Sequence, residues 1–232
     1  MALYDRDYTS SQSRDFGYAQ EASSSVAFMK KTYKLLGLSM ITAALGAYLT
    51  MPFADTVRDW KWAIFALEMF MIFFGLNMTR NKPTLNLAAL FFFTFLTGVS
   101  IVPLLGSLIS AGNGAIIGNA FLMTSVLFGA LSIFAINSKS DFSNWGKPLF
   151  ITMIVILVAS LINIFILKSP LMGVIITAGI LLLFSLFTIY DTQNLANGAY
   201  DSEVDAAVSL YLDFFNMFTV ILQLLGIMGS DD

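Results

Sequence analysis

The 232-residue chain contains no cysteine and no histidine. Without cysteine it has no disulfide bonds and no thiolate ligands, which excludes disulfide-stapled domains and cysteine-based zinc sites. Histidine is the only side chain whose ordinary titration falls near neutral pH. A group of this chain that responds to neutral pH is therefore a carboxyl group in an unusual environment or the N-terminal amine.

Charged residues are also scarce. They make up 12% of the chain, against about 25% in ordinary globular domains, while 57% of the residues are hydrophobic. A water-soluble fold could not keep so much apolar side chain off its surface, so the composition predicts a polytopic membrane protein whose first partner is the lipid bilayer. The net charge of −3 is small and indicates no nucleic-acid partner.

The N-terminal segment is polar and rich in serine and aspartate, and it carries no apolar stretch of the kind found in a signal peptide. We expect residues 1–29 to form a disordered tail. The remainder, residues 30–232, is expected to form one transmembrane domain.

Apolar runs long enough to cross the ~30 Å hydrocarbon core of a bilayer recur along this domain. Lipid offers the backbone no hydrogen-bond partner and alternating strand patterns are absent, so the runs are predicted to be helices and the fold to be all-α. Pro52 and the segments NKPT, AGNG, DFSNWGKP and KSP separate them. The seven predicted spans are residues 33–51, 62–78, 85–109, 115–136, 149–167, 171–190 and 206–228.

Basic residues predict the orientation of these spans, whose odd number puts the termini on opposite sides of the membrane. Loops rich in lysine and arginine stay on the cytoplasmic side. We therefore expect a cytoplasmic N-terminus and an external C-terminal GSDD. Seven basic residues flank the spans on the N-terminal side and three on the other: Lys30, Lys31, Lys34, Arg80, Lys82, Lys139 and Lys147, against Arg58, Lys61 and Lys168.

Three carboxylic acids lie within or beside the spans, where an ionised group is costly and marks a candidate functional site. Glu68 lies in the middle of the second span, where it either bonds to neighbouring helices or lines an ion pathway. Asp191 ends the sixth span. Because the helix dipole disfavours negative charge at a C-terminus, a cation or a proton is expected beside it.

Asp213 lies about two turns into the seventh span, on a polar stripe. Ser209, Asp213, Asn216 and Gln223 follow the i, i+4, i+7, i+14 spacing that puts side chains on one helix face. Such a stripe faces the protein interior or water, so the seventh helix is predicted to be central. The stripe suits an ion pathway and, equally well, a structural seam of hydrogen bonds.

The topology brings three charged residues to one depth. The second span ends, the sixth ends and the seventh begins on the same side, so Arg80, Asp191 and Asp213 are expected close to one level. Two neighbouring carboxylates resist double ionisation and can share a proton. Arg80 is then either an anchor at the membrane surface or the partner of the two carboxyl groups.

The segments LFTIYDTQNL, around Asp191, and VSLYLDFFNMFTVILQLLGIMGSDD, around Asp213, resemble the last two helices of the transmembrane Bax inhibitor motif family, in particular its bacterial branch. TGVSIVPLL in the third span and AFLMTSVLF in the fourth resemble the family signature. Val102 stands where the family usually has glycine, and Ser125 where it usually has alanine.

The resemblance implies seven helices, the last surrounded by six that form two three-helix layers. It implies a pH-sensitive calcium leak channel of the bacterial inner membrane that needs no cofactor and binds calcium only in transit. It further implies that Asp191 and Asp213 form the pH sensor and that Arg80 is their gating partner. Glu68, Ser209, Asn216 and Gln223 are candidates for lining the pathway, because of their positions in the spans.

Other functions fit the same sequence. A membrane regulator would bind protein partners from stress, proteolysis or cell-death machinery, with the polar tail as the binding segment. A proton-coupled cation exchanger would use the same carboxyl groups. Intramembrane aspartyl proteases also carry YD and a later aspartate on consecutive helices, but their Gly-x-Gly-Asp motif is replaced here by the bulky run LYLD, so we expect no enzymatic activity.

Overall fold

The computed structural model describes residues 6–228, with side chains over residues 24–227. Every element in this part of the chain is helical, and seven helical segments are long and apolar enough to cross a membrane. They lie where the seven apolar runs of the sequence predict them. The all-helical, seven-span prediction is confirmed for these residues.

Several spans contain more than one helical element. Prolines mark the first residue of two helices, since α5 starts at Pro83 and α9 at Pro170. Proline is tolerated at this position because the N–H group that it lacks would have no partner within the helix. In chain order the elements are α1 (Arg6–Thr50), the 3₁₀ turn Met51–Phe53, α2 (Ala54–Asp59), α3 (Lys61–Phe70), the π-helical turn Met71–Gly75, α4 (Leu76–Thr79), α5 (Pro83–Ser100), α6 (Val102–Ser110), α7 (Ala115–Asn137), the 3₁₀ turn Ser143–Trp145, α8 (Gly146–Ile162), the π-helical turn Asn163–Leu167, α9 (Pro170–Ala196) and α10 (Glu203–Met228).

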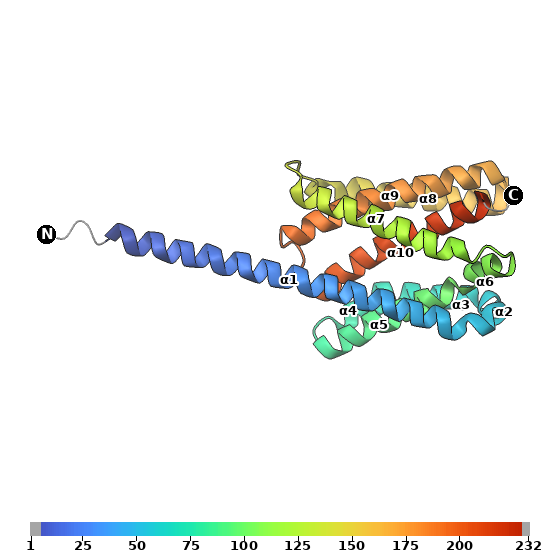
Figure 1. Cartoon of the computed structure of the whole chain (residues 1–232), viewed down its shortest axis with the longest axis horizontal. Helices are drawn as coiled ribbons and strands as arrows, with labels where there is room; N and C mark the ends of the chain where they lie inside the picture. The colour runs from blue at the N-terminus through green and yellow to red at the C-terminus, as the bar shows by residue number, and fades with distance from the viewer. Residues whose placement is uncertain (1–5, 229–232) are drawn as a thin grey trace.

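The helix α10 runs obliquely between two groups of helices. Figure 1 shows α7, α8 and α9 on one side of it, and α1 with α3 to α6 on the other. α10 packs against α9, α1, α7 and α5, whereas α3 packs mainly on α5 and α8 on α9. Ala206, Ala207 and Met217 of α10 are fully buried. The two alanines let neighbouring helices approach α10 closely, because their side chains are small.

Two glycines allow α1 and α5 to cross with their backbones almost in contact. A Cβ atom on Gly98 would lie 1.9 Å from the carbonyl oxygen of Ala43, and one on Gly46 would lie 2.3 Å from that of Phe95. No larger residue fits at either position without moving a helix. The pair α1 and α5 therefore forms a closely packed wall on one side of α10.

The outer surface of the bundle is apolar. α8 and the π-helical turn after it are the clearest case: Leu149 is the one buried residue between Gly146 and Leu167, and the exposed residues include Val155 and Ile166. In water this surface would be strongly unfavourable, whereas lipid solvates it without cost. The protein is an integral membrane protein.

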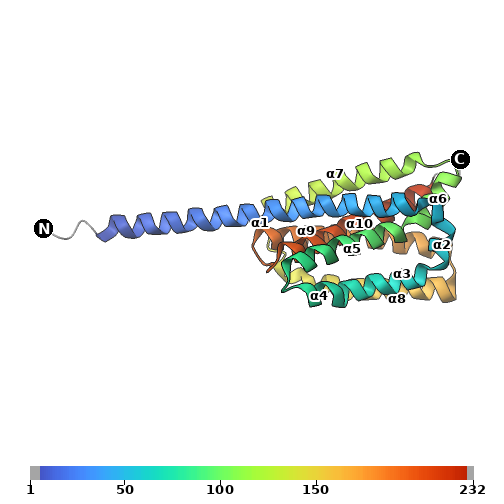
Figure 2. The ribbon, with the colours of Figure 1, turned by 90° about the horizontal axis from the view of Figure 1, so that it is seen from below.

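The helix α1 extends well beyond the bundle at its N-terminal end (Figure 2). The composition predicts disorder for residues 1–29, but α1 already begins at Arg6, and Phe28 and Met29 pack against the buried core. The segment contains one glycine and no proline, so a helix nucleated in the membrane continues into it at little cost. Residues 1–5 lie outside the described part, and the division of the chain at residue 29 stays a prediction.

Candidate functional site

The centre of the candidate site is a buried pair of carboxyl groups. Asp191 comes from the last turns of α9 and Asp213 from the third turn of α10, and their exposed fractions are 8% and 3%. The two groups lie close enough for a direct side-chain hydrogen bond. Ionised carboxylates only accept hydrogen bonds, so the two groups can bond to each other only when one of them is protonated. The structure thus brings together the two residues expected to sense protons.

Tyr200 completes this pair from the loop between α9 and α10. Its hydroxyl group donates a hydrogen bond to Asp191 Oδ1 at 2.8 Å, and the Ser209 hydroxyl lies within hydrogen-bonding reach of the same tyrosine. Gly198, with φ +69°, provides the left-handed turn that folds this loop back over the helix ends. Burial raises the pKa of Tyr200 above its ordinary value, so the residue stays a hydrogen-bond donor at physiological pH.

One oxygen of the pair has no partner. Asp213 Oδ2 is buried and accepts no hydrogen bond from any described residue. An unsatisfied buried acceptor is costly, and for a carboxylate the natural compensation is a proton or a cation. The pair therefore contains one acceptor without a partner, Asp213 Oδ2 on α10, and one acceptor with a partner, Asp191 Oδ1 on α9, which is bonded to Tyr200.

Arg80 does not contact the carboxyl pair, in contrast to the pairing that the resemblance implies. Its guanidinium forms ion pairs with Asp205, at 2.5 Å, and with Asp201, at 3.3 Å. The Arg80 side chain follows α4 and is 45% exposed, whereas Asp213 lies eight residues, or about 12 Å, further along α10 than Asp205. The guanidinium thus remains at the mouth of the bundle.

A second cation reaches the same region. Lys31 of α1 pairs with Glu203 at 2.9 Å. We call Asp201, Glu203 and Asp205 the acidic start of α10. Negative charge is favourable at a helix N-terminus, and here Lys31 and Arg80 tie that start to α1 and α4 as well.

Glu68 belongs to a separate buried polar cluster. Its side chain on α3 lies within hydrogen-bonding reach of the Ser100 hydroxyl, and its Oε1 has no hydrogen-bond partner among the described residues. Close by, the Tyr211 hydroxyl of α10 is hydrogen-bonded to that of Thr97. The π-helical turn Met71–Gly75 begins three residues after Glu68, and such turns frequently occur at functional sites. Glu68 is thus buried between helices but not joined to the carboxyl pair.

The remaining residues of the polar stripe are peripheral to the pair. Asn216 donates its side-chain amide to the Leu212 carbonyl of its own helix, at 2.7 Å, and Asn216 and Gln223 are both half-buried. Only Ser209 joins the network, through Tyr200. Tyr200 itself is not among the residues that the sequence identifies, although its place in the short loop between two acid-bearing helices was a usable signal.

The arrangement can hold and release a proton or a hard cation, because it combines two carboxyl groups with one open oxygen. Among the described residues no group of three acidic, histidine or cysteine side chains gathers around one point.

Comparison with known proteins shows that the chain is similar to one family of membrane proteins. Residues 26–230 match the model of the family described as inhibitor of apoptosis-promoting Bax1. An uncharacterized protein of Helicobacter pylori is 48% identical, with both chains covered completely, and one of Campylobacter jejuni is 41% identical over 99% of this chain and 100% of its own. The Escherichia coli protein named modulator of FtsH protease YccA is 30% identical over 88% of this chain and 91% of its own. Its counterpart from a second E. coli strain is named an inner membrane protein.

Proposed function

Because the chain belongs to the Bax inhibitor family, with bacterial relatives such as YccA, we propose that it is a regulator in the bacterial inner membrane that acts on a membrane-bound protease. The observation that carries this proposal is the similarity to the E. coli relative, which is named a modulator of FtsH protease. The two sequences are 30% identical over 88% of this chain. The names of these relatives describe membrane proteins and a modulator, and none names a catalytic activity.

The extended N-terminal part of α1 supports a role of this kind. It projects beyond the bundle in both views, on the side where the basic residues of the loops are concentrated (Figures 1 and 2). By the positive-inside rule this is the cytoplasmic side. A helix that stands clear of the lipid is accessible to a soluble domain of a partner, and residues 6–23 are therefore the proposed binding segment.

The proposal is tested by removing that segment. The full chain and a variant lacking residues 2–23 are co-expressed with the FtsH-type protease of the same bacterium, and the degradation rate of a membrane substrate and the recovery of the protease with each chain are measured. We expect the full chain to change the rate and to bind the protease, and the truncated chain to do neither. An unchanged rate with the full chain present in excess would overturn the proposal.

The buried carboxyl pair supports a second candidate function, a pH-sensitive calcium leak. Carboxylate oxygens are the ligands that calcium prefers, and a pathway with two of them binds the ion too weakly to retain it. We propose that Asp191 and Asp213 are the proton sensor of this pathway, that α10 is its central helix and that Glu68 lines its other half.

In this candidate function the acidic start of α10 is the gate. Arg80 and Lys31 hold it against α4 and α1, so the first turn of α10 can move only when these ion pairs loosen. Protonation of the carboxyl pair one helix segment away changes how α9 and α10 attract each other. A bias of a few kcal/mol is enough to shift a two-state gate strongly. Arg80 is then a gating partner that acts through Asp205 and not through the pair itself.

Purified protein in liposomes tests the leak. Calcium entry is followed with an enclosed dye over a pH series, first without and then with an imposed proton gradient. A leak raises calcium entry as the pH falls and does so without a gradient, whereas an exchanger requires the gradient. Calcium entry equal to that of empty liposomes at every pH would rule out the leak. It would not affect the proposal of a protease regulator, which is tested separately by the truncation of residues 2–23.

A further inference from the structure

A cavity of about 570 Å³ lies at the cytoplasmic end of α8, apart from both buried polar clusters. Its lining comes from the 3₁₀ turn Ser143–Trp145, from the start of α8 and from one side chain of α9, Tyr190. One half of the lining is polar and the other half is apolar.

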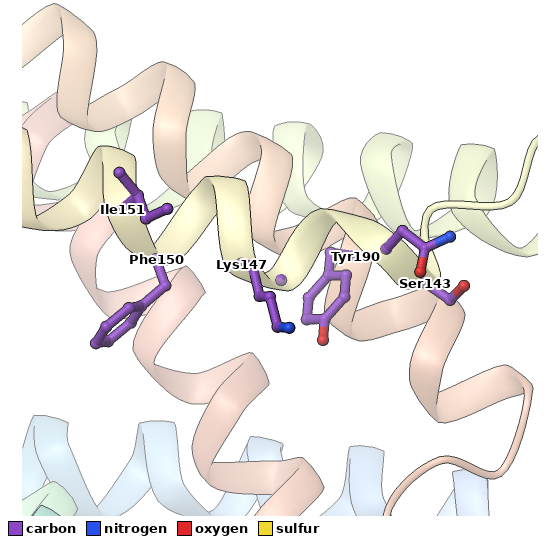
Figure 3. Close-up of a pocket in the computed structure, with 7 residues that line it drawn as sticks. Ser143, Lys147, Phe150, Ile151 and Tyr190 are labelled. Atoms are coloured by element: carbon purple, nitrogen blue, oxygen red, sulfur yellow. The ribbon is translucent and has the colours of Figure 1, made fainter.

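The polar half is suited to an anion. Lys147 and Tyr190 point in the same direction from two different helices, whereas Ser143 lines the cavity apart from them (Figure 3). Within the part of the chain whose side chains are described, Lys147 forms no ion pair and the Tyr190 hydroxyl no hydrogen bond. An ammonium group and a hydroxyl donor side by side match the oxygens of a phosphate group.

The apolar half continues along the lipid-facing side of α8. Phe150 and Ile151 line it, and their exposed fractions are 55% and 61%. A free phosphate ion would make no use of these residues, whereas the hydrocarbon chain of a lipid would cover them. A molecule with an anionic head and an apolar tail at the membrane surface is a phospholipid.

We infer that this cavity binds an anionic phospholipid of the cytoplasmic leaflet. The phosphate lies against Lys147 and Tyr190, and an acyl chain runs along Phe150 and Ile151. The ligand would thus contact Tyr190 of α9, the residue that directly precedes Asp191. A bound lipid would therefore contact α9 next to the carboxyl pair.

Gly146 explains how Tyr190 reaches this position. A Cβ atom on Gly146 would lie 2.5 Å from the Tyr190 hydroxyl oxygen and 2.9 Å from the adjoining ring carbon. The absence of a side chain there lets the tyrosine hydroxyl rest on the first turn of α8, beside Lys147. Replacement by alanine displaces the hydroxyl without changing the charge of the protein, which separates a shaped site from general attraction between lysine and an anionic surface.

The test is native mass spectrometry of the purified full chain in detergent, with phosphatidylglycerol or phosphatidylcholine added at equal concentrations. The wild-type protein is expected to retain the anionic lipid about fivefold more strongly, the effect of about one favourable lysine contact. Lys147→Gln is expected to abolish this preference, and Gly146→Ala, which displaces the Tyr190 hydroxyl but keeps the lysine, is expected to weaken it. Lys139→Gln is the matched control, because Lys139 lies in the same loop region, is exposed and does not line the cavity.

Three results would overturn the inference. The first is equal retention of both lipids by the wild-type protein. The second is an equal loss in Lys147→Gln and Lys139→Gln, which indicates surface charge alone. The third is displacement of the lipid by millimolar inorganic phosphate, which indicates a site for a free anion. Lys147→Arg, which keeps the charge, should retain the preference, and circular dichroism of each variant verifies that it is folded.

Discussion

The Tyr200 hydroxyl group donates a hydrogen bond to Asp191 Oδ1 at 2.8 Å, so the loop between the last two helices is tied directly to the buried carboxyl pair. The same hydroxyl lies within reach of Ser209 on α10. Movement of the loop therefore changes the surroundings of Asp191, and the loop also leads to Asp201 and Asp205, which pair with Arg80. The carboxyl pair and the acidic start of α10 are connected through this short segment.

The first prediction concerns Tyr200. Tyr200→Phe removes the bond to Asp191 and should lower the free energy of unfolding by about 1 kcal/mol at neutral pH, measured by thermal melting in detergent. Burial raises the pKa of Tyr200, so its contribution is complete below the ordinary tyrosine pKa of about 10 and is lost as the pH rises through the raised value. In alkaline titration followed by tyrosinate absorbance, the variant should lack one late-ionising tyrosine. Identical titration curves would contradict this assignment.

The second prediction concerns the pair itself. If Asp191 and Asp213 sense protons, Asp191→Asn and Asp213→Asn should each flatten the pH dependence of calcium entry into liposomes while the protein remains folded. Asparagine keeps the size and the hydrogen-bonding capacity of the side chain but cannot exchange a proton. A pair with a purely structural role predicts the opposite result, namely lower melting temperatures and an unchanged pH response.

The third prediction concerns the ion pair between Arg80 and Asp205. Because both side chains are partly exposed, we expect a coupling free energy of only about 0.5–1 kcal/mol in a double-mutant cycle of Arg80→Ala and Asp205→Asn. Both single variants should raise calcium entry at high pH, and the double variant should raise it no further. Arg80→Ala combined with Asp191→Asn should instead give additive effects on stability. Strong coupling of Arg80 to Asp191 and none to Asp205 would refute the observed pairing.

The fourth prediction concerns the crossing of α1 and α5. Gly98→Ala places a methyl group 1.9 Å from a backbone oxygen of α1, so the helices must separate. Overpacking of this kind typically costs about 1–3 kcal/mol, and we expect at least that loss in melting experiments. Gly129→Ala on α7 is the matched control, since nothing lies within 4 Å of its added Cβ atom. It should be neutral or slightly stabilising, because alanine favours helices. Equal losses in both variants would show that the crossing is not tightly packed.

The fifth prediction concerns orientation. A reporter enzyme fused after Asp232 should be active only outside the cytoplasm, and one fused near Trp145 only within it, because seven basic residues flank one side of the membrane domain and three the other. Reporters that agree with each other in location would be incompatible with the three spans that separate Trp145 from the C-terminus.

The sequence by itself determined the helical class, the number of spans and their positions. The reason is that lipid leaves the backbone no hydrogen-bond partner, so hydrophobic length alone predicts a helix. It also placed Asp191 and Asp213 at a similar depth, because alternating spans bring their helix ends to the same side. Both inferences depend on the position along a helix and not on the direction of any side chain.

The tertiary structure decided the rest. The depth of Arg80 left two roles open and the family resemblance implied pairing with the carboxyl groups, yet Arg80 pairs with Asp205. Which of several acids a flexible arginine reaches depends on the lateral packing of α4 against α10. Tyr200 reaches Asp191 only because the loop folds back over the helix ends, and Gly98 matters only because α1 crosses at that level. Such relationships join residues that are distant in the chain or separated by a turn, so they arise when the helices pack and not from hydropathy or spacing.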